Sequence, residues 1–241
     1  MKSKLRLPDV TLVCVSSVRL RRSLASLHIS MSQIEFGKVC FFSHKMAVLT
    51  NPAVQFYEVP KLETIDDYNK FVLFELGKSI MTSHALIVQS DSYVIDPGAW
   101  DSRFLEFDYV GAPWPVRDDA YRDPWGRSQR VGNGGFSLRS KRLMQLPSVV
   151  EVPYDVNSSD FYQHMNAGLN SEDGNICVHN RHIYETHGCV FAPIEIASRF
   201  SRELVIDGLD QSATFGFHRY RKLGGRAKRA PWFRGFCVTK R

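Results

Sequence analysis

The sequence predicts a single α/β domain with a mixed, mostly parallel central sheet and helices packed on its faces. The first observation is a set of short apolar runs rich in β-forming residues, which are typical of strands buried on both faces. The second is that amphipathic helical patterns separate these runs. Residues 1–90 give the order strand, helix, strand, strand, helix, strand, as in an open α/β sheet. In such sheets, ligands bind at the carboxyl ends of the strands.

The elements of the first half follow from these patterns. Strands are expected at residues 10–15, 39–43, 54–59 and 84–89. A helix is expected over residues 21–31, where apolar residues recur on one face. A second helix is expected behind Thr64, because Asp67 lies three positions later and completes a variant of the capping box.

The second half is less regular. Helices are expected over residues 100–107, 141–145, 171–186 and 196–200, and strands over 109–115, 136–139 and 190–193, while residues 215–218 close the body of the domain. The chain shows no internal repeat and no interdomain linker. We therefore expect one domain over residues 1–218, followed by a tail over residues 219–241.

The composition is that of a soluble globular protein. Of the 241 residues, 44% are hydrophobic and 23% are charged, which excludes a mostly disordered chain, a coiled coil and a collagen-like repeat. The five cysteines include no Cys-x-x-Cys pair, a pattern typical of free thiols in a reducing compartment. No stretch approaches the roughly 18 apolar residues of a spanning helix, and the N-terminal apolar run is short for a signal peptide. We expect a cytoplasmic protein.

The net charge of +6 is unevenly distributed. Residues 219–241 hold nine basic and no acidic residues, whereas residues 1–218 hold 22 basic and 25 acidic residues, a net charge of −3. Aromatic side chains such as Trp232 and Phe233 lie among the cations of this tail. Such a tail can contact an anionic membrane, bind RNA or stay solvated. Because the body of the chain lacks a basic footprint, nucleic acid is not the expected partner.

Two candidate sites follow predicted strands or turns. Asp91 lies directly behind the strand at 84–89, where one carboxylate can bind a hard divalent cation, although Asp and Ser are also common at turns. The three glycines within residues 132–135 permit a close approach of backbone to a ligand, although a hairpin turn needs the same residues. The segment is not a P-loop, because no Gly-Lys-Ser/Thr follows.

Two further candidates lie near the ends of predicted elements. Glu172 and Asp173 open a predicted helix, where acidic residues suit the helix dipole, and a carboxylate there can also act as a general base. His218 is a candidate metal ligand or a structural histidine. Cysteines and histidines crowd residues 177–189, but on a continuous helix positions 177 and 182 lie roughly 140° apart and cannot share one zinc ion.

In this order, the motifs resemble those of an uncharacterised glycosyltransferase-like family, formerly a domain of unknown function. The most specific strings are Gly-Ala-Pro-Trp at 111–114 and Gly-Asn-Gly-Gly-Phe-Ser-Leu-Arg at 132–139. The resemblance covers roughly residues 7–218. More distantly, the layout is similar to nucleotide-sugar transferases of the GT-A fold, a relative of the Rossmann fold.

The resemblance implies a function and a chemistry. The function would be transfer of a sugar from a nucleotide-sugar donor to a glycan, a lipid-linked acceptor or another hydroxyl acceptor, as in polysaccharide biosynthesis, with Mn²⁺ or Mg²⁺ as cofactor. Inversion would be favoured over retention, since one base suffices. For an enzyme that acts on lipid-linked acceptors, the basic tail would suit a peripheral contact with the inner membrane surface.

The resemblance also assigns roles to residues. Asp91 and His218 would hold the metal, Asp173 would be the base, and Glu172 beside it would contact a sugar. The donor site would comprise residues at strand ends and in the glycine segment: Ser16, Ser17, Gln89, Asn133, Gly134 and Gly135. Asp91 would be the second Asp of an Asp-x-Asp motif, but the first Asp is absent, because Gln89 and Ser90 precede Asp91. The alternative function is therefore a non-catalytic module that binds a nucleotide sugar or glycan.

Overall fold

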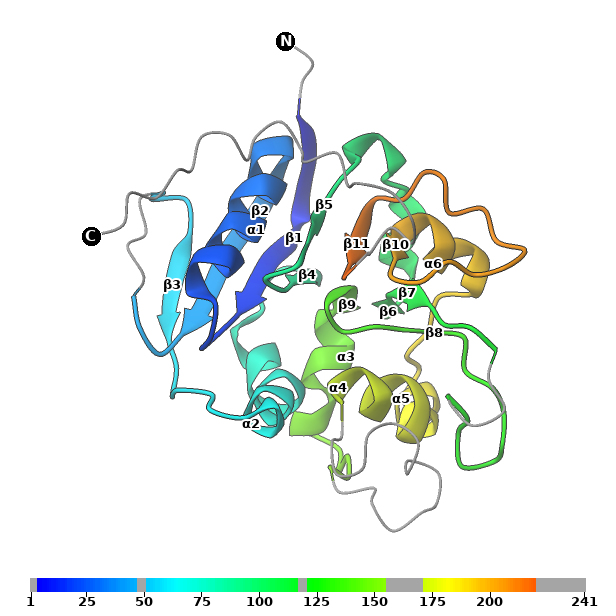
Figure 1. Cartoon of the computed structure of the whole chain (residues 1–241). Coiled ribbons are helices and arrows are strands. Elements are labelled where there is room, and N and C mark those ends of the chain that lie inside the picture. The colour runs from blue at the N-terminus through cyan, green and yellow to red at the C-terminus, as the bar shows by residue number, and fades with distance from the viewer. Residues whose placement is uncertain (1–3, 47–50, 117–120, 155–170, 220–241) are drawn as a thin grey trace.

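The computed structural model describes residues 4–46, 51–116, 121–154 and 171–219. Its centre is a six-stranded sheet in the order β3-β2-β1-β4-β9-β6 (Figure 1). The strands are β1 (Leu5–Val15), β2 (Ile34–Ser43), β3 (Gln55–Glu58), β4 (His84–Val88), β6 (Tyr109–Val110) and β9 (Phe136–Ser140). Strands β1 to β4 are parallel, and β9 runs antiparallel to both β4 and β6. The sheet is thus mixed and mostly parallel, as predicted.

Both faces of the sheet are covered, which explains the continuous apolar runs of the parallel strands. In β1, Leu12 and Cys14 face a cluster that includes residues of α1 (Leu20–Gln33). Val13 and Val15 face the other cluster, which includes residues of α3 (Lys141–Gln145) and of the segment behind α2 (Ile65–Lys70). Figure 1 shows α1 alongside β1 and β2, and α2 below their carboxyl ends.

The capping box predicted at the start of α2 is present. The Thr64 hydroxyl accepts the backbone N–H of Asp67 at 3.0 Å, and the Asp67 carboxylate accepts the backbone N–H of Thr64 at 2.9 Å. After six residues the α-helix continues as a π-helical turn over Phe71–Glu75 and a 3₁₀ turn over Leu76–Ser79. The predicted helix therefore exists but changes its winding along its length.

The prediction of one continuous helix over residues 171–186 is wrong. Ser171 caps α4 (Glu172–Gly174), a π-helical turn follows over Asn175–His179, and α5 (Arg181–Thr186) begins only after a break at Asn180. The Asn180 amide donates to the Pro153 carbonyl at 2.7 Å and to the Asn175 side chain at 3.0 Å. These hydrogen bonds hold the break. Positions 177 and 182 therefore do not lie on one continuous helix, and the angle of roughly 140° expected between them does not apply.

The second half adds two small sheets and a helix. These elements are β5 (Ser92–Val94), β7 (Ala112–Pro113), β8 (Val131–Gly132), α6 (Ile194–Phe200), β10 (Ser201–Arg202) and β11 (Gly216–His218). The helix predicted over 100–107 is instead a 3₁₀ turn over Ser102–Glu106, capped by Asp101. Strand β11 pairs antiparallel with β5, so His218 lies opposite Ser92. This pairing brings the end of the domain back to the carboxyl end of β4.

The predicted tail over residues 219–241 lies outside the described residues except for Arg219. The division of the chain into a domain and a tail therefore stays a prediction. Within the described parts of the chain, no helix has the length and apolar character needed to cross a membrane.

Candidate active site

The segment behind β4 brings Asp91 next to the end of β11. The Oδ1 atom of Asp91 lies 3.6 Å from Nε2 of His218, and its Oδ2 atom lies 3.5 Å from Nε of Arg219. The pairing of β11 with β5 fixes this approach. The two side chains predicted to share a metal ion are therefore neighbours, although 127 positions separate them in the sequence.

His218 lies between two carboxylates. Its Nδ1 atom is 3.3 Å from Oε1 of Glu203, on the opposite side of the ring from Asp91. Both contacts are within ion-pair distance, but neither has hydrogen-bond geometry. Burial lowers the pKa of His218, yet the carboxylates of Asp91 and Glu203 outweigh burial and raise it to about 9. His218 in turn holds the pKa of Asp91 below its ordinary value, against the opposing effect of burial.

The glycine segment passes directly beside this histidine. A Cβ atom on Gly135 would lie only 2.3 Å from the His218 ring, so the close contact needs glycine. The Gly135 N–H donates to Oδ1 of Asn133 at 3.0 Å, and the Asn133 amide also contacts Glu203. Asn133 has a φ of 72°, a left-handed conformation that non-glycine residues adopt mostly at turns and functional sites.

The same segment contacts the predicted base on its other side. The Gly134 N–H donates to Oδ2 of Asp173 at 3.0 Å, and Asp173 is half-buried. Oδ1 of Asp173 accepts the backbone N–H of Gly174 at 2.9 Å. Adjacent glycines thus link the predicted metal ligand His218 to the predicted base Asp173.

Glu172 is buried and paired. Its Oε2 atom lies 2.9 Å from the guanidinium of Arg139, and the residue is only 3% exposed. Burial raises the pKa of Glu172 to about 7, with Arg139 opposing the rise and Asp173 adding to it. The predicted contact of Glu172 with a sugar would require the carboxylate to leave this ion pair.

The other predicted donor residues lie at the carboxyl ends of β1 and β4, and their side chains contact protein groups. The Ser17 hydroxyl accepts the backbone N–H of Leu62 at 2.8 Å, and the Ser16 hydroxyl donates to the Val18 carbonyl. The Gln89 amide donates to the Tyr68 hydroxyl at 2.9 Å. Each of these contacts would have to open or adjust before the side chain could bind a donor.

Sequence reasoning missed three charged residues of the site: Arg139, Glu203 and Arg219. Arg139 lies inside a recognised motif, and a charged residue in an otherwise uncharged strand could have marked it as paired. Glu203 and Arg219 occur in segments without any motif. Only the pairing of β10, β11 and β5 brings them to Asp91 and His218.

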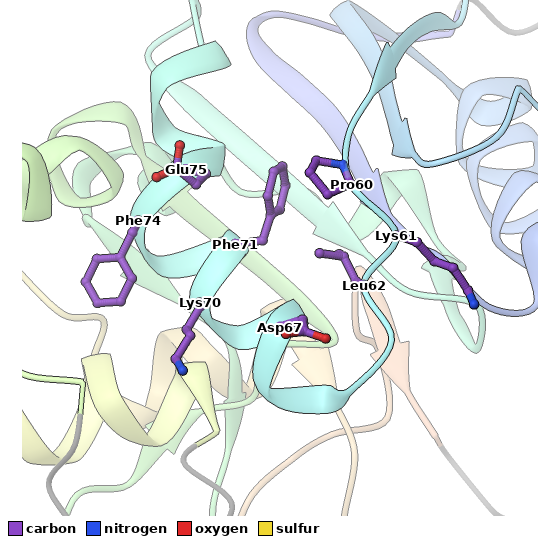
Figure 2. A pocket seen from close by; sticks show the side chains of 8 residues that line it. All are labelled: Pro60, Lys61, Leu62, Asp67, Lys70, Phe71, Phe74 and Glu75. Carbon is purple, nitrogen blue, oxygen red and sulfur yellow. The ribbon is translucent and has the colours of Figure 1, made fainter.

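A surface groove of about 360 Å³ is lined by the segment before α2, by α2 itself and by the π-helical turn that follows it (Figure 2). Its walls are formed by Pro60, Lys61, Leu62, Asp67, Lys70, Phe71, Phe74 and Glu75. None of these is a predicted site residue, so the groove is not the candidate active site. Among the described residues, no group of three or more His, Cys, Asp or Glu side chains is arranged to hold a metal ion.

Comparison with known proteins decides the family. A family model described as a protein of unknown function (DUF5672) matches residues 52–218, which include Asp91, the glycine segment, Asp173 and His218. The chain belongs to the DUF5672 family. This confirms the resemblance predicted from the motifs, and it places Ser16 and Ser17 outside the region that the DUF5672 model matches. A search of curated protein sequences found no match.

Solved structures similar to this DUF5672 protein show its fold. The galactosyltransferase LgtC in complex with donor and acceptor sugar analogues has a TM-score of 0.54 at 14% identity. An active-site mutant of LgtC has a TM-score of 0.53 at 13% identity, and each comparison covers 86% of both chains. The fold is therefore that of the GT-A glycosyltransferases, as predicted. At this identity the likeness shows the fold alone.

Proposed function

We propose that the protein is a glycosyltransferase that moves a sugar from a nucleotide-sugar donor to a hydroxyl group of a glycan or lipid-linked acceptor. One observation carries the proposal: Gly134 and Gly135 contact Asp173 on one side and His218, next to Asp91, on the other. A candidate base and a candidate diphosphate site thus adjoin the same short backbone segment. The GT-A fold supports this reading, because LgtC, which shares it, was solved with donor and acceptor sugar analogues.

In the proposed reaction, Asp173 takes the proton of the acceptor hydroxyl as that oxygen attacks the anomeric carbon of the donor. Asp173 is half-buried and accepts two backbone N–H groups, which fix its carboxylate. An ionised carboxylate has about four lone-pair sites, so these bonds leave room for the hydroxyl. Attack opposite the leaving diphosphate, with one base, gives inversion at the anomeric carbon.

Asp91 and the neutral form of His218 fit a divalent cation in the types of atom they offer, so a bound cation would have to displace the proton of His218. Their carboxylate and imidazole groups are adjacent, and Mg²⁺ commonly takes only one or two protein ligands together with substrate phosphates and water. The cation, when bound, would offset the negative charge of the leaving diphosphate. Ser16, Ser17, Gln89 and Asn133 would line the donor at the carboxyl end of the sheet.

The second candidate function is a non-catalytic module that binds a nucleotide sugar or glycan. Gln89 and Ser90 favour it, since they leave one carboxylate directly behind β4 where an Asp-x-Asp motif would supply two. Such a module would keep the fold and the glycine segment. It would bind the donor without turning it over.

Release of free nucleotide from a panel of nucleotide sugars separates these functions. For a transferase, the wild-type protein releases nucleotide, and Asp173→Asn lowers the rate by roughly 10²–10⁴-fold, the usual contribution of a general base, while donor affinity stays near wild type. The matched control is Asp207→Asn at an exposed position, which should keep full turnover. Nucleotide binding without any turnover would favour the binding module. Full turnover by Asp173→Asn would refute its role as base.

A further inference from the structure

The strand behind the glycine segment carries a fully buried arginine. Arg139 lies in β9 with no exposed surface, and its guanidinium donates to Oε2 of Glu172 at 2.9 Å. Its Nε atom donates to the Ser137 hydroxyl at 3.0 Å, and the Tyr109 ring lies 5.1 Å from its guanidinium carbon. The Tyr109 hydroxyl in turn donates to the Asn133 carbonyl at 3.2 Å. These contacts join β9, β6, the glycine segment and α4 around one cation.

A buried ion pair of this kind needs a reason other than stability. Removing two charges from water is costly, and apolar residues of similar size are often as stabilising or more so. Such pairs are better attested as devices that fix one arrangement. Here the arrangement concerns α4, since Glu172 is its first residue and Asp173 its second.

Gly134 contacts both Glu172, the ion-pair partner of Arg139, and Asp173. The Glu172 carboxylate occupies the space where a Cβ atom of Gly134 would stand, at 1.7 Å from Oε1. The next residue, Asp173, accepts the N–H of the same glycine at 3.0 Å. Because Glu172 and Asp173 are neighbours in one short helical turn, fixing the first carboxylate against the glycine segment also fixes the second.

We propose that Arg139 is a positioning residue, which anchors Glu172 and thereby holds the Asp173 carboxylate against the Gly134 backbone. The inference rests on the proposed function, in which Asp173 is the base. It gives Glu172 a role toward its neighbour instead of a contact with a sugar. Without the Arg139 guanidinium, the buried Glu172 carboxylate would become neutral or turn away, and the Asp173 carboxylate would lose its fixed direction.

The test combines kinetics with a measurement at Gly134 that does not need catalysis. Arg139→Met removes the cation, and Arg139→Lys keeps a charge without the guanidinium fork. Should Arg139→Met alone fail to fold, the double variant Arg139→Met with Glu172→Gln avoids an unpaired buried charge. Arg142→Met is the control, because it breaks a different arginine–carboxylate pair, with Asp108, in which neither Glu172 nor Asp173 takes part.

We expect Arg139→Met or the double variant to lower kcat by tenfold or more, up to the roughly 10²–10⁴-fold of losing the base, with the donor KM within about twofold. Arg139→Lys should recover part of this loss, and Arg142→Met should keep kcat. The ¹⁵N–¹H resonance of Gly134 should shift and its hydrogen exchange should accelerate, because its bond to Asp173 is loosened. If Glu172 instead contacts the sugar, Glu172→Gln should raise the donor or acceptor KM and leave kcat unchanged.

Two results would overturn the proposal. One is near-wild-type kcat in folded Arg139→Met or in the folded double variant, and the other is an unchanged Gly134 amide in these variants. The amide measurement applies even if the wild-type protein turns over no donor. Failure of the proposed function would show as absent turnover by the wild-type protein, whereas failure of the positioning role would show as an unchanged Gly134 amide in the Arg139 variants.

Discussion

Replacing Gly135 by alanine should dislodge His218. The new Cβ atom would lie 2.3 Å from the imidazole ring, whereas non-bonded carbon atoms rest about 3.5–4.0 Å apart. The backbone cannot easily yield, since the Gly135 N–H is bound to Asn133 and its carbonyl accepts from the Gln89 backbone and the Ser92 hydroxyl. The ring must therefore move by more than about 1 Å, which changes its position relative to Asp91.

The expected cost follows from this overlap. Overpacking a buried site typically costs about 1–3 kcal/mol, and in a domain of this size each kcal/mol lowers Tm by about 2–4 °C. Thermal unfolding should show this loss, and titration calorimetry with a nucleoside diphosphate and Mn²⁺ should show that metal-dependent binding is abolished. The control is Gly98→Ala, where the nearest atom is an Asp96 carboxylate oxygen at 3.1 Å that can move. Wild-type binding by a folded Gly135→Ala protein would refute the placement of His218 in the metal site.

Three further predictions concern other groups. Asp91→Asn should abolish Mn²⁺-dependent nucleotide binding without unfolding the protein, and unchanged Mn²⁺ dependence in calorimetry would contradict its role. Burial raises the pKa of Asp108, but Arg142, Ser140 and the Val190 N–H outweigh it and lower the pKa. Its stabilisation is thus present above the unfolded value of about 3.9 and is lost as pH falls through the folded value. Asp108→Asn should cost about 1–3 kcal/mol at pH 7 in urea unfolding and less near pH 3; an equal cost at both pH values would contradict this. Deleting residues 219–241 should abolish salt-sensitive binding to anionic vesicles in sedimentation assays, and equal binding by the truncated protein would rule out a membrane role for the tail.

Strands β1, β2 and β4 of the sheet were predictable, because each of them contains a continuous apolar run that can be recognised from neighbouring residues alone. The runs at 10–15 and 39–43 form the C-terminal halves of β1 and β2, and the run at 84–89 matches β4, since strands buried on both faces need continuous apolar residues. The capping box at Thr64 was also predictable, because it depends only on residues a few positions apart. What failed was the winding of helices. Nothing local reveals the break at Asn180, since its hydrogen bond to the Pro153 carbonyl joins distant parts of the chain.

The candidate site likewise contains residues that the sequence could reveal and contacts that it could not. Asp91, Gly134, Gly135 and Asp173 could be found because they lie in short strings with a known spacing. The contacts of His218 with Glu203 could not, since they depend on how β10 and β11 return to β5. The burial of Glu172 could not be predicted either, because its partner Arg139 lies in a strand 33 positions earlier.

A crystal structure with a non-hydrolysable nucleotide-sugar analogue and Mn²⁺ would test the central claim most directly. We predict the diphosphate and cation beside Asp91 and His218, with the anomeric carbon facing the side of the glycine segment that holds Asp173. An analogue seated elsewhere, such as the groove between Leu62 and Phe71, or a cation bound without Asp91, would contradict it.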